Sequence, residues 1–106
     1  MPKYLFQSSY TAEGARGLLK EGGTSREAYL KSLAESHGAK LEAYYFAFGD
    51  TDIYTIFEVP DNATAAALSL AVSASGAARV KTVVLLTAEE IDAAAKQNVS
   101  FRAPGA

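Results

Sequence analysis

Two alternating apolar segments joined by a short polar turn constrain the fold of this chain of 106 residues more than any other feature. The segments flank Gly49-Asp50-Thr51-Asp52 and together extend from Leu41 to Val59. Because successive side chains of a strand point to opposite faces, this pattern predicts an antiparallel hairpin that is largely apolar on both faces. The helices of a small domain can cover one face of such a sheet. The second face therefore indicates a ligand, a partner or another copy of the chain.

Strict alternation also assigns the side chains of the first hairpin strand to faces. Leu41 shares one face with Ala43 and Tyr45, and Tyr44 and Phe46 lie on the other. Each face of the hairpin thus receives at least one aromatic ring.

The rest of the chain completes a pattern of strands and helices. Strands are expected at residues 3–10 and 79–86, and helices at about residues 12–22, 24–37, 61–76 and 88–97. This order predicts an α+β fold, a ferredoxin-like βαββαβ sandwich with a four-stranded antiparallel sheet and an extra C-terminal helix. A single domain is expected at residues 1–97. The tail at residues 98–106 either docks on a neighbour through Phe101 and Pro104 or frays.

Two sequences have the spacing of a capping box, in which a threonine and a glutamate satisfy free backbone N–H groups at a helix start. Thr24 and Glu27 predict that a helix restarts after the Gly22-Gly23 break. Thr87 and Glu90 predict the start of the last helix.

The helix that follows Pro60 is almost entirely apolar and rich in alanine. Such a helix is expected to be buried nearly all round. Packing on the sheet explains much of this pattern, and the small alanine side chains also suit a contact with another subunit.

The composition excludes several classes of site and partner. The chain has no cysteine, which excludes disulfides, thiolate nucleophiles and cysteine-bound metals, and one histidine gives little basis for a metal site. A net charge of −2 argues against a nucleic-acid partner. No segment has membrane-spanning length, and the N-terminus lacks the apolar run of a signal peptide. We therefore expect a cytoplasmic protein with no membrane partner and no cofactor.

Four segments spread over nearly the whole chain form a specific set. They are Lys3-Tyr4-Leu5-Phe6, Lys20-Glu21-Gly22-Gly23, Tyr45-Phe46-Ala47-Phe48-Gly49-Asp50 and Asp61-Asn62-Ala63-Thr64-Ala65-Ala66-Ala67. As a set, they resemble the GYD domain family. At the turn, Gly49 and Asp52 match the glycine and aspartate of its name, whereas Thr51 stands where its tyrosine is expected. The resemblance implies a small ferredoxin-like domain related to the dimeric α+β barrels, and it implies no particular activity.

Aromatic side chains of the strands are the first candidates for a binding site. With Ser8, they are expected to line a pocket on the open face of the sheet, where hydroxyl groups supply the few polar contacts that a small ligand needs. Equally, the same rings can form the core of a dimer. The rings are those of Tyr4, Phe6, Tyr10, Tyr44, Phe46, Phe48 and Tyr54.

A second candidate site lies at the glycine break, where free backbone N–H groups stand beside cationic side chains and suit a carboxylate or phosphate. The alternative is a helix break with a good cap. The anion-binding candidates are Lys20, Gly22, Gly23, Thr24 and Arg26.

Three other polar residues have possible catalytic roles. Asp50 and Asp52 can bind a cation or act as acid and base, although turns favour aspartate for structural reasons. His37 is the only side chain that normally titrates near neutrality, and its place in the last turn of a helix favours a structural role.

The favoured function is a homo-oligomer that binds a small apolar or aromatic ligand, or a protein partner, on the open sheet face. The alternative is a cofactor-free enzyme of the dimeric barrel type, with His37, Asp52 or a tyrosine as proton carrier. RNA binding is disfavoured because the strand at residues 52–59 lacks the basic, glycine-containing motif of RNA-recognition domains.

Overall fold

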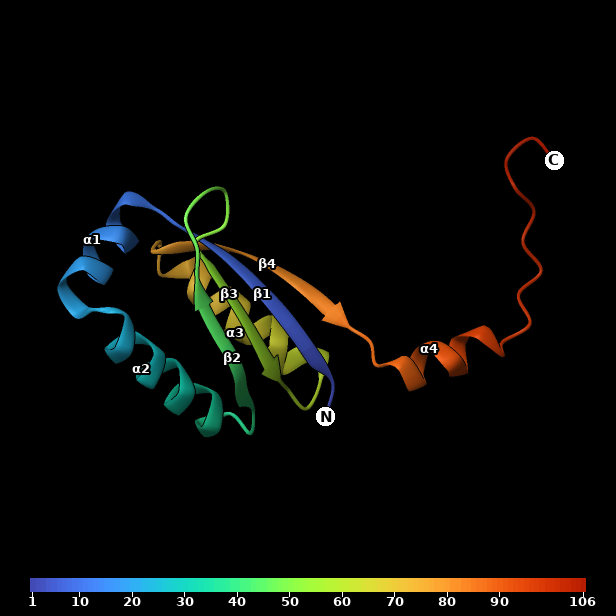
Figure 1. Ribbon diagram of the computed structural model, residues 1–106, viewed down its shortest axis with the longest axis horizontal. Helices are drawn as coiled ribbons and strands as arrows, with labels where there is room; N and C mark the ends of the chain where they lie inside the picture. The colour runs from blue at the N-terminus through green and yellow to red at the C-terminus, as the bar shows by residue number, and fades with distance from the viewer.

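The computed structural model describes all 106 residues and confirms the α+β, ferredoxin-like architecture (Figure 1). A four-stranded antiparallel sheet has the strand order β2-β3-β1-β4. In Figure 1, α3 lies behind the sheet, whereas α1 and α2 lie beside β2. The elements are β1 (Lys3–Tyr10), α1 (Ala12–Glu21), α2 (Gly23–Ser36), β2 (Lys40–Phe46), β3 (Ile53–Glu58), α3 (Asn62–Ala74), β4 (Ala78–Leu85) and α4 (Ala88–Ala95).

The core lies on one face of the sheet, which we call the covered face. Sheet residues contact α2 and α3 there, and the rings of Phe6 and Phe57 meet edge to face with centroids 5.3 Å apart. Only 11 of the 106 residues are buried, so a single chain leaves much of its apolar surface accessible. The core residues are Tyr4, Phe6, Ala34, Ala39, Phe57, Val59 and Ala65.

A β-bulge in β2 changes which of its side chains reach the core. Leu41 pairs with Phe57, and after the shift in register Tyr44 pairs with Thr55 and Phe46 with Ile53. Because paired residues point to the same face, all of these side chains lie on the covered face. The prediction from strict alternation, which placed Leu41 on the opposite face from Tyr44 and Phe46, is therefore wrong. The extra residue of the bulge reverses the face to which each later side chain of β2 points.

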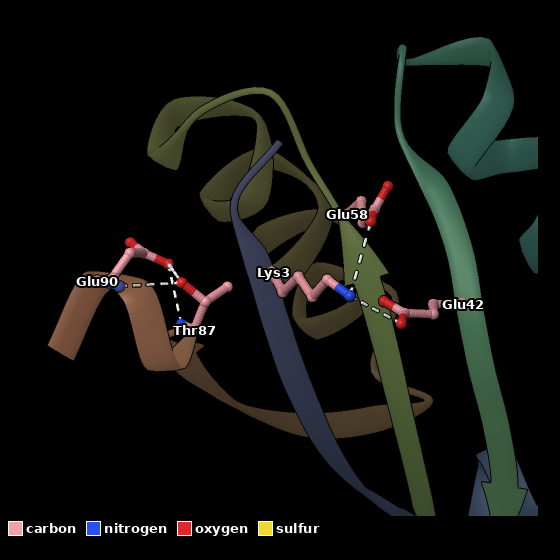
Figure 2. A network of polar contacts seen from close by, with 5 residues as sticks. All are labelled: Lys3, Glu42, Glu58, Thr87 and Glu90. Carbon is pink, nitrogen blue, oxygen red and sulfur yellow. Dashed lines mark hydrogen bonds and ion pairs between the residues drawn. The ribbon is translucent and has the colours of Figure 1, made fainter. Parts of the chain in front are cut away.

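Side-chain caps begin three of the four helices. The Thr11 hydroxyl accepts from the backbone N–H of Gly14 at the start of α1, and the Asp61 carboxylate accepts from that of Thr64 at the start of α3. The capping box of Thr87 and Glu90 at α4 is confirmed (Figure 2).

The predicted capping box at α2 is wrong. The helix begins at Gly23, one residue before Thr24, and its N-cap is Gly22 at a φ of 85°, with no side-chain cap. Thr24 therefore lies inside the first turn, where its hydroxyl is no longer placed to accept from the N–H group three residues ahead.

α1 also makes a close backbone contact with the loop before β4. A Cβ atom at Gly14 would lie 1.9 Å from the carbonyl oxygen of Ala77, and the backbone N–H of Thr11 donates to that same oxygen over 3.0 Å. Only glycine allows this approach.

The prediction that α3 is buried nearly all round is also wrong. Ala65 is its only fully buried residue, and Leu70 is 68% exposed. A single layer of helices covers the sheet, so the outward side of α3 faces solvent.

The chain beyond β4 extends away from the sandwich (Figure 1). We call residues 86–106 the C-terminal arm; it comprises α4 and the tail at residues 98–106, and every residue in it is exposed. Its large apolar side chains are those of Leu86, Ile91, Val99 and Phe101.

Candidate functional site

A cavity of about 280 Å³ lies between the covered face of the sheet and helices α2 and α3. Hydrophobic residues make up 14 of the 19 that line it, including Leu30 and Leu33 from α2, and Leu68 and Val72 from α3. Ligand pockets in proteins are usually concave, mostly apolar and supplied with a few polar groups, and this cavity has that character.

Arg26 is the only charged residue among those that line the cavity. Its guanidinium stacks over the ring of Tyr29, with Cζ 4.9 Å from the ring centroid. The nearest carboxylate, that of Glu21, has an oxygen 3.9 Å from Nη1, at the outer limit of an ion pair. Since the cation is held mainly by stacking, its N–H donors are not consumed by a close carboxylate.

Two tyrosine hydroxyls are buried without a hydrogen-bond partner, those of Tyr10 and Tyr44. Tyr10 lines the cavity and Tyr44 does not, but the two phenols are close enough for each to influence the pKa of the other. Burial raises the pKa of both groups, and the nearby Arg26 opposes the rise. Both therefore stay protonated near neutral pH and can donate a hydrogen bond. Buried donors without an acceptor are rare and costly.

The prediction that seven rings line the open sheet face requires correction. Only Tyr54, which is 39% exposed, lies on that face. Phe48 is in the turn and is 99% exposed. The other rings, and Ser8 with them, point to the covered face because they share pairing rows with core or cavity-lining residues. They are Tyr4, Phe6, Tyr10, Tyr44 and Phe46.

These residues have different roles on the covered face. Tyr4 is core, and its hydroxyl donates to Oδ1 of Asn62 at the start of α3. Phe6 belongs both to the core and to the cavity wall, whereas Ser8 and Tyr10 line the cavity further along β1. Phe46 packs on the backbone of α2, where a Cβ at Gly23 would lie 3.0 Å from its ring.

The open face carries a mixed surface of apolar and charged side chains. Lys3 Nζ lies 2.9 Å from a carboxylate oxygen of Glu42 and 3.8 Å from one of Glu58 (Figure 2). The hydrogen bond to Glu42, supported by the charge of both carboxylates, raises the pKa of Lys3. The apolar side chains on the same face are those of Leu5, Tyr45, Tyr54, Ile56 and Val83.

The structure divides the predicted anion-binding residues. Arg26 turns into the cavity, whereas Lys20, Gly22 and Thr24 are exposed at the junction of α1 and α2. Gly23 lies beneath the Phe46 ring. The five residues therefore do not converge on one point, and Arg26 is grouped instead with the tyrosines of β1 and β2.

Asp52 and His37 contact the backbone. The Asp52 carboxylate accepts from the backbone N–H of Tyr10 over 2.8 Å, which ties the turn after β2 to the end of β1. Nδ1 of His37 lies 3.1 Å from the carbonyl oxygen of Leu33 at the end of α2. Neither residue lines the cavity, and Asp50 is exposed. Nowhere do three histidine or acidic side chains come together as a metal site would need.

Sequence reasoning missed the contribution of α3 to the cavity wall. Leu68, Val72 and Ser75 line it. Their spacing of three to four residues marks one side of the helix, but the neighbouring alanines and leucine obscure that side.

The fold and the cavity define a small α+β domain with an internal apolar hollow and a polar end. The chain belongs to the GYD domain family, whose model matches residues 4–95. No match was found among the curated proteins or among the solved structures. No helix of this chain combines the length and the hydropathy that a membrane-spanning segment needs.

Proposed function

We propose that this protein binds a small, largely apolar or aromatic molecule in the cavity between its sheet and its helices, and that it works as a homo-oligomer. The observation that carries the first part is the cavity itself, an apolar wall with one cation and a few hydroxyl groups. That combination is typical of sites that bind small molecules by burial and orient them by a few polar contacts.

Binding is favoured over catalysis because the cavity lacks a suitable proton carrier. His37 and Asp52 are outside it and contact the backbone. The raised pKa values of Tyr10 and Tyr44 make both phenols poor bases near neutral pH. A cofactor-free enzyme would need a group of intermediate pKa facing the substrate.

Native mass spectrometry of the protein purified from its own cells tests the ligand. Leu68→Trp would fill part of the cavity, and Leu70→Trp, on the exposed side of α3, is the matched control. We expect a retained small molecule on the wild type and on the control, and its loss from Leu68→Trp. A wild type without any bound molecule, or a molecule unaffected by Leu68→Trp, would contradict the proposal.

Oligomerisation is supported by two apolar surfaces that one chain leaves uncovered, the open face of the sheet and the C-terminal arm. Their charges also complement one another. Arg79 and Lys81 of β4 form no ion pair within the chain, and neither do Glu89 and Asp92 of the arm. A second copy of the chain would cover both apolar surfaces and pair both sets of charges.

Tyr54→Asp on the open face tests the oligomer. A buried, unpaired carboxylate in a subunit interface is strongly unfavourable, so we expect this variant to be a folded monomer by light scattering and circular dichroism. Ser73→Asp, on the exposed side of α3, is the control and should keep the wild-type mass. If Tyr54→Asp has the same mass as the wild type, the open face is not the interface.

A further inference from the structure

We propose that the cavity selects molecules with a carboxylate at one end and a short apolar body, and that Arg26, Tyr10 and Tyr44 bind the carboxylate. This inference rests on the proposed function, because it names the chemical class of the ligand for the same cavity. It is drawn from three separate features of the polar end of that cavity: its charge, its unused donors and its size.

The only charged side chain that lines the cavity is a cation. It is that of Arg26, and no aspartate or glutamate lines the cavity. Three acidic groups act on the tyrosines from outside the lining. The Glu21 oxygen lies 3.9 Å from the Arg26 guanidinium, and the Asp52 carboxylate accepts from the Tyr10 backbone. The third, Glu27, raises the pKa of Tyr44. An apolar hollow that contains one cation favours an anionic ligand over a neutral one of the same shape.

The unused donors are the hydroxyls of Tyr10 and Tyr44. Each is shielded from solvent and makes no well-formed hydrogen bond within the protein. The two hydroxyls interact with each other, and this interaction affects the pKa of both. They come from β1 and β2, on either side of β3, and lie within the electrostatic influence of Arg26. A carboxylate has two oxygens that together accept about four hydrogen bonds, so it can satisfy both hydroxyls and the guanidinium at once.

The stacking of Arg26 on Tyr29 supports the same conclusion. When the flat face of a guanidinium stacks on a ring, its N–H groups point outward in the plane of the guanidinium and remain available as donors. A planar carboxylate is the partner that such an edge binds best.

The size of the cavity limits the apolar body. At about 280 Å³, it lies at the small end of the range for ligand sites. The helices α2 and α3 supply the leucine and valine side chains that would surround this body. A monocarboxylate with a short alkyl chain or a single ring fits this space better than a long-chain lipid does.

Calorimetric titration of the full-length protein with octanoate and with octanol tests the inference. The two probes share an alkyl chain and differ in the charged end. We expect octanoate to bind about tenfold more tightly than octanol, since a hydrogen bond to a charged group contributes more than one to a neutral group. Arg26→Gln should reduce octanoate affinity about tenfold and leave octanol unchanged. Arg79→Gln, on the open face of β4, should change neither.

Tyr44→Phe provides a second readout that does not depend on Arg26. Removing a buried hydroxyl without a partner should raise the melting temperature of the free protein, while octanoate binds several-fold more weakly. A lower melting temperature would show that the hydroxyl has a structural partner and would overturn this part of the inference. Tyr45→Phe, which changes a 71% exposed side chain, is the control.

The outcomes separate the inference from the proposed function. Equal binding of octanoate and octanol, or an octanoate affinity that Arg26→Gln does not change, overturns carboxylate selection and leaves an apolar binding cavity. If neither probe binds, the cavity does not take small apolar molecules and the proposed function is overturned.

Discussion

Both faces of the sheet carry apolar side chains, but the two faces have different physical roles. On the covered face, Phe6 and Phe57 interlock and pack against helices that also enclose the cavity. On the open face, Tyr54 and its apolar neighbours lie uncovered on the same surface as the charged group formed by Lys3 and Glu42. An apolar pattern alone therefore does not identify a core. What distinguishes the core is the helices that lie over it.

The difference also explains where a ligand would bind. Helices α2 and α3 cover one face without filling all the space beneath them, which leaves an apolar hollow. The open face has no such cover within one chain, and it suits a second protein surface better than a small molecule.

The largest expected effect is a difference in stability between one substitution on the covered face and one on the open face. Phe57→Ala should lower the free energy of unfolding by about 3 kcal/mol, because it removes a large buried side chain and leaves a void. Tyr54→Ala on the open face should lower it by less than about 1 kcal/mol. Urea denaturation at low protein concentration, where contacts between subunits contribute little, measures both. Equal losses would contradict the distinction between the faces.

A smaller effect is expected at the turn between β2 and β3, where hydrogen bonds to the end of β1 help to fix the strand register. The Asp52 carboxylate accepts from the Tyr10 N–H group over 2.8 Å, and its own N–H donates to the carbonyl oxygen of Ser8. Asp52→Ala should lower the free energy of unfolding by about 1.5–2 kcal/mol, the lower part of the range for a hydrogen bond to a charged group. The control is Asp50→Ala, whose side chain makes no hydrogen bond, and it should be neutral in the same denaturation experiment. A neutral Asp52→Ala would show that strand pairing alone sets the register.

The smallest expected effect concerns the helix that covers the sheet. The Thr64 N–H group donates to the carboxylate of Asp61 at the start of α3 and lowers the pKa of that carboxylate below its ordinary value of 3.8. A lowered pKa in the folded state means that this contribution to stability is complete above 3.8 and is lost as the pH falls through the folded value.

Asp61→Asn keeps a capping side chain that does not titrate. We therefore expect the wild type to lose stability relative to this variant between neutral pH and about pH 3, as measured by denaturation midpoints. A constant difference between the two proteins across this range would mean that the carboxylate does not cap α3.

Much of the fold could be predicted because its signals are local. The hairpin at residues 41–59, the order of strands and helices, and the capping box of Thr87 and Glu90 all depend on residues close together in sequence. The failures have two kinds of cause. The box at Thr24 was wrong for a local reason, because α2 begins one residue earlier, at Gly23. The facing of Tyr44 and Phe46 was wrong because the bulge depends on pairing between β2 and β3.

The candidate site was predicted only in parts. Arg26 was predicted as an anion-binding residue together with its sequence neighbours, of which none lines the cavity that Arg26 lines. The aromatic residues of β1 and β2 were predicted as ligand-binding candidates, and most of them were assigned to the wrong face of the sheet. Periodicity reveals that two faces are apolar, but it does not reveal which one the helices will cover.

The sequence by itself determined the local elements of this protein, since side-chain period, turn residues and helix caps act over one or two turns of chain. Only the tertiary structure decided which side of the sheet became the core and that Arg26 and Tyr10 line one cavity, with Tyr44 within the electrostatic influence of Arg26. These outcomes depend on strand register, on the bulge in β2 and on how helices pack over a sheet. All three are set by contacts between residues that are distant in sequence, so no short segment of the chain encodes them.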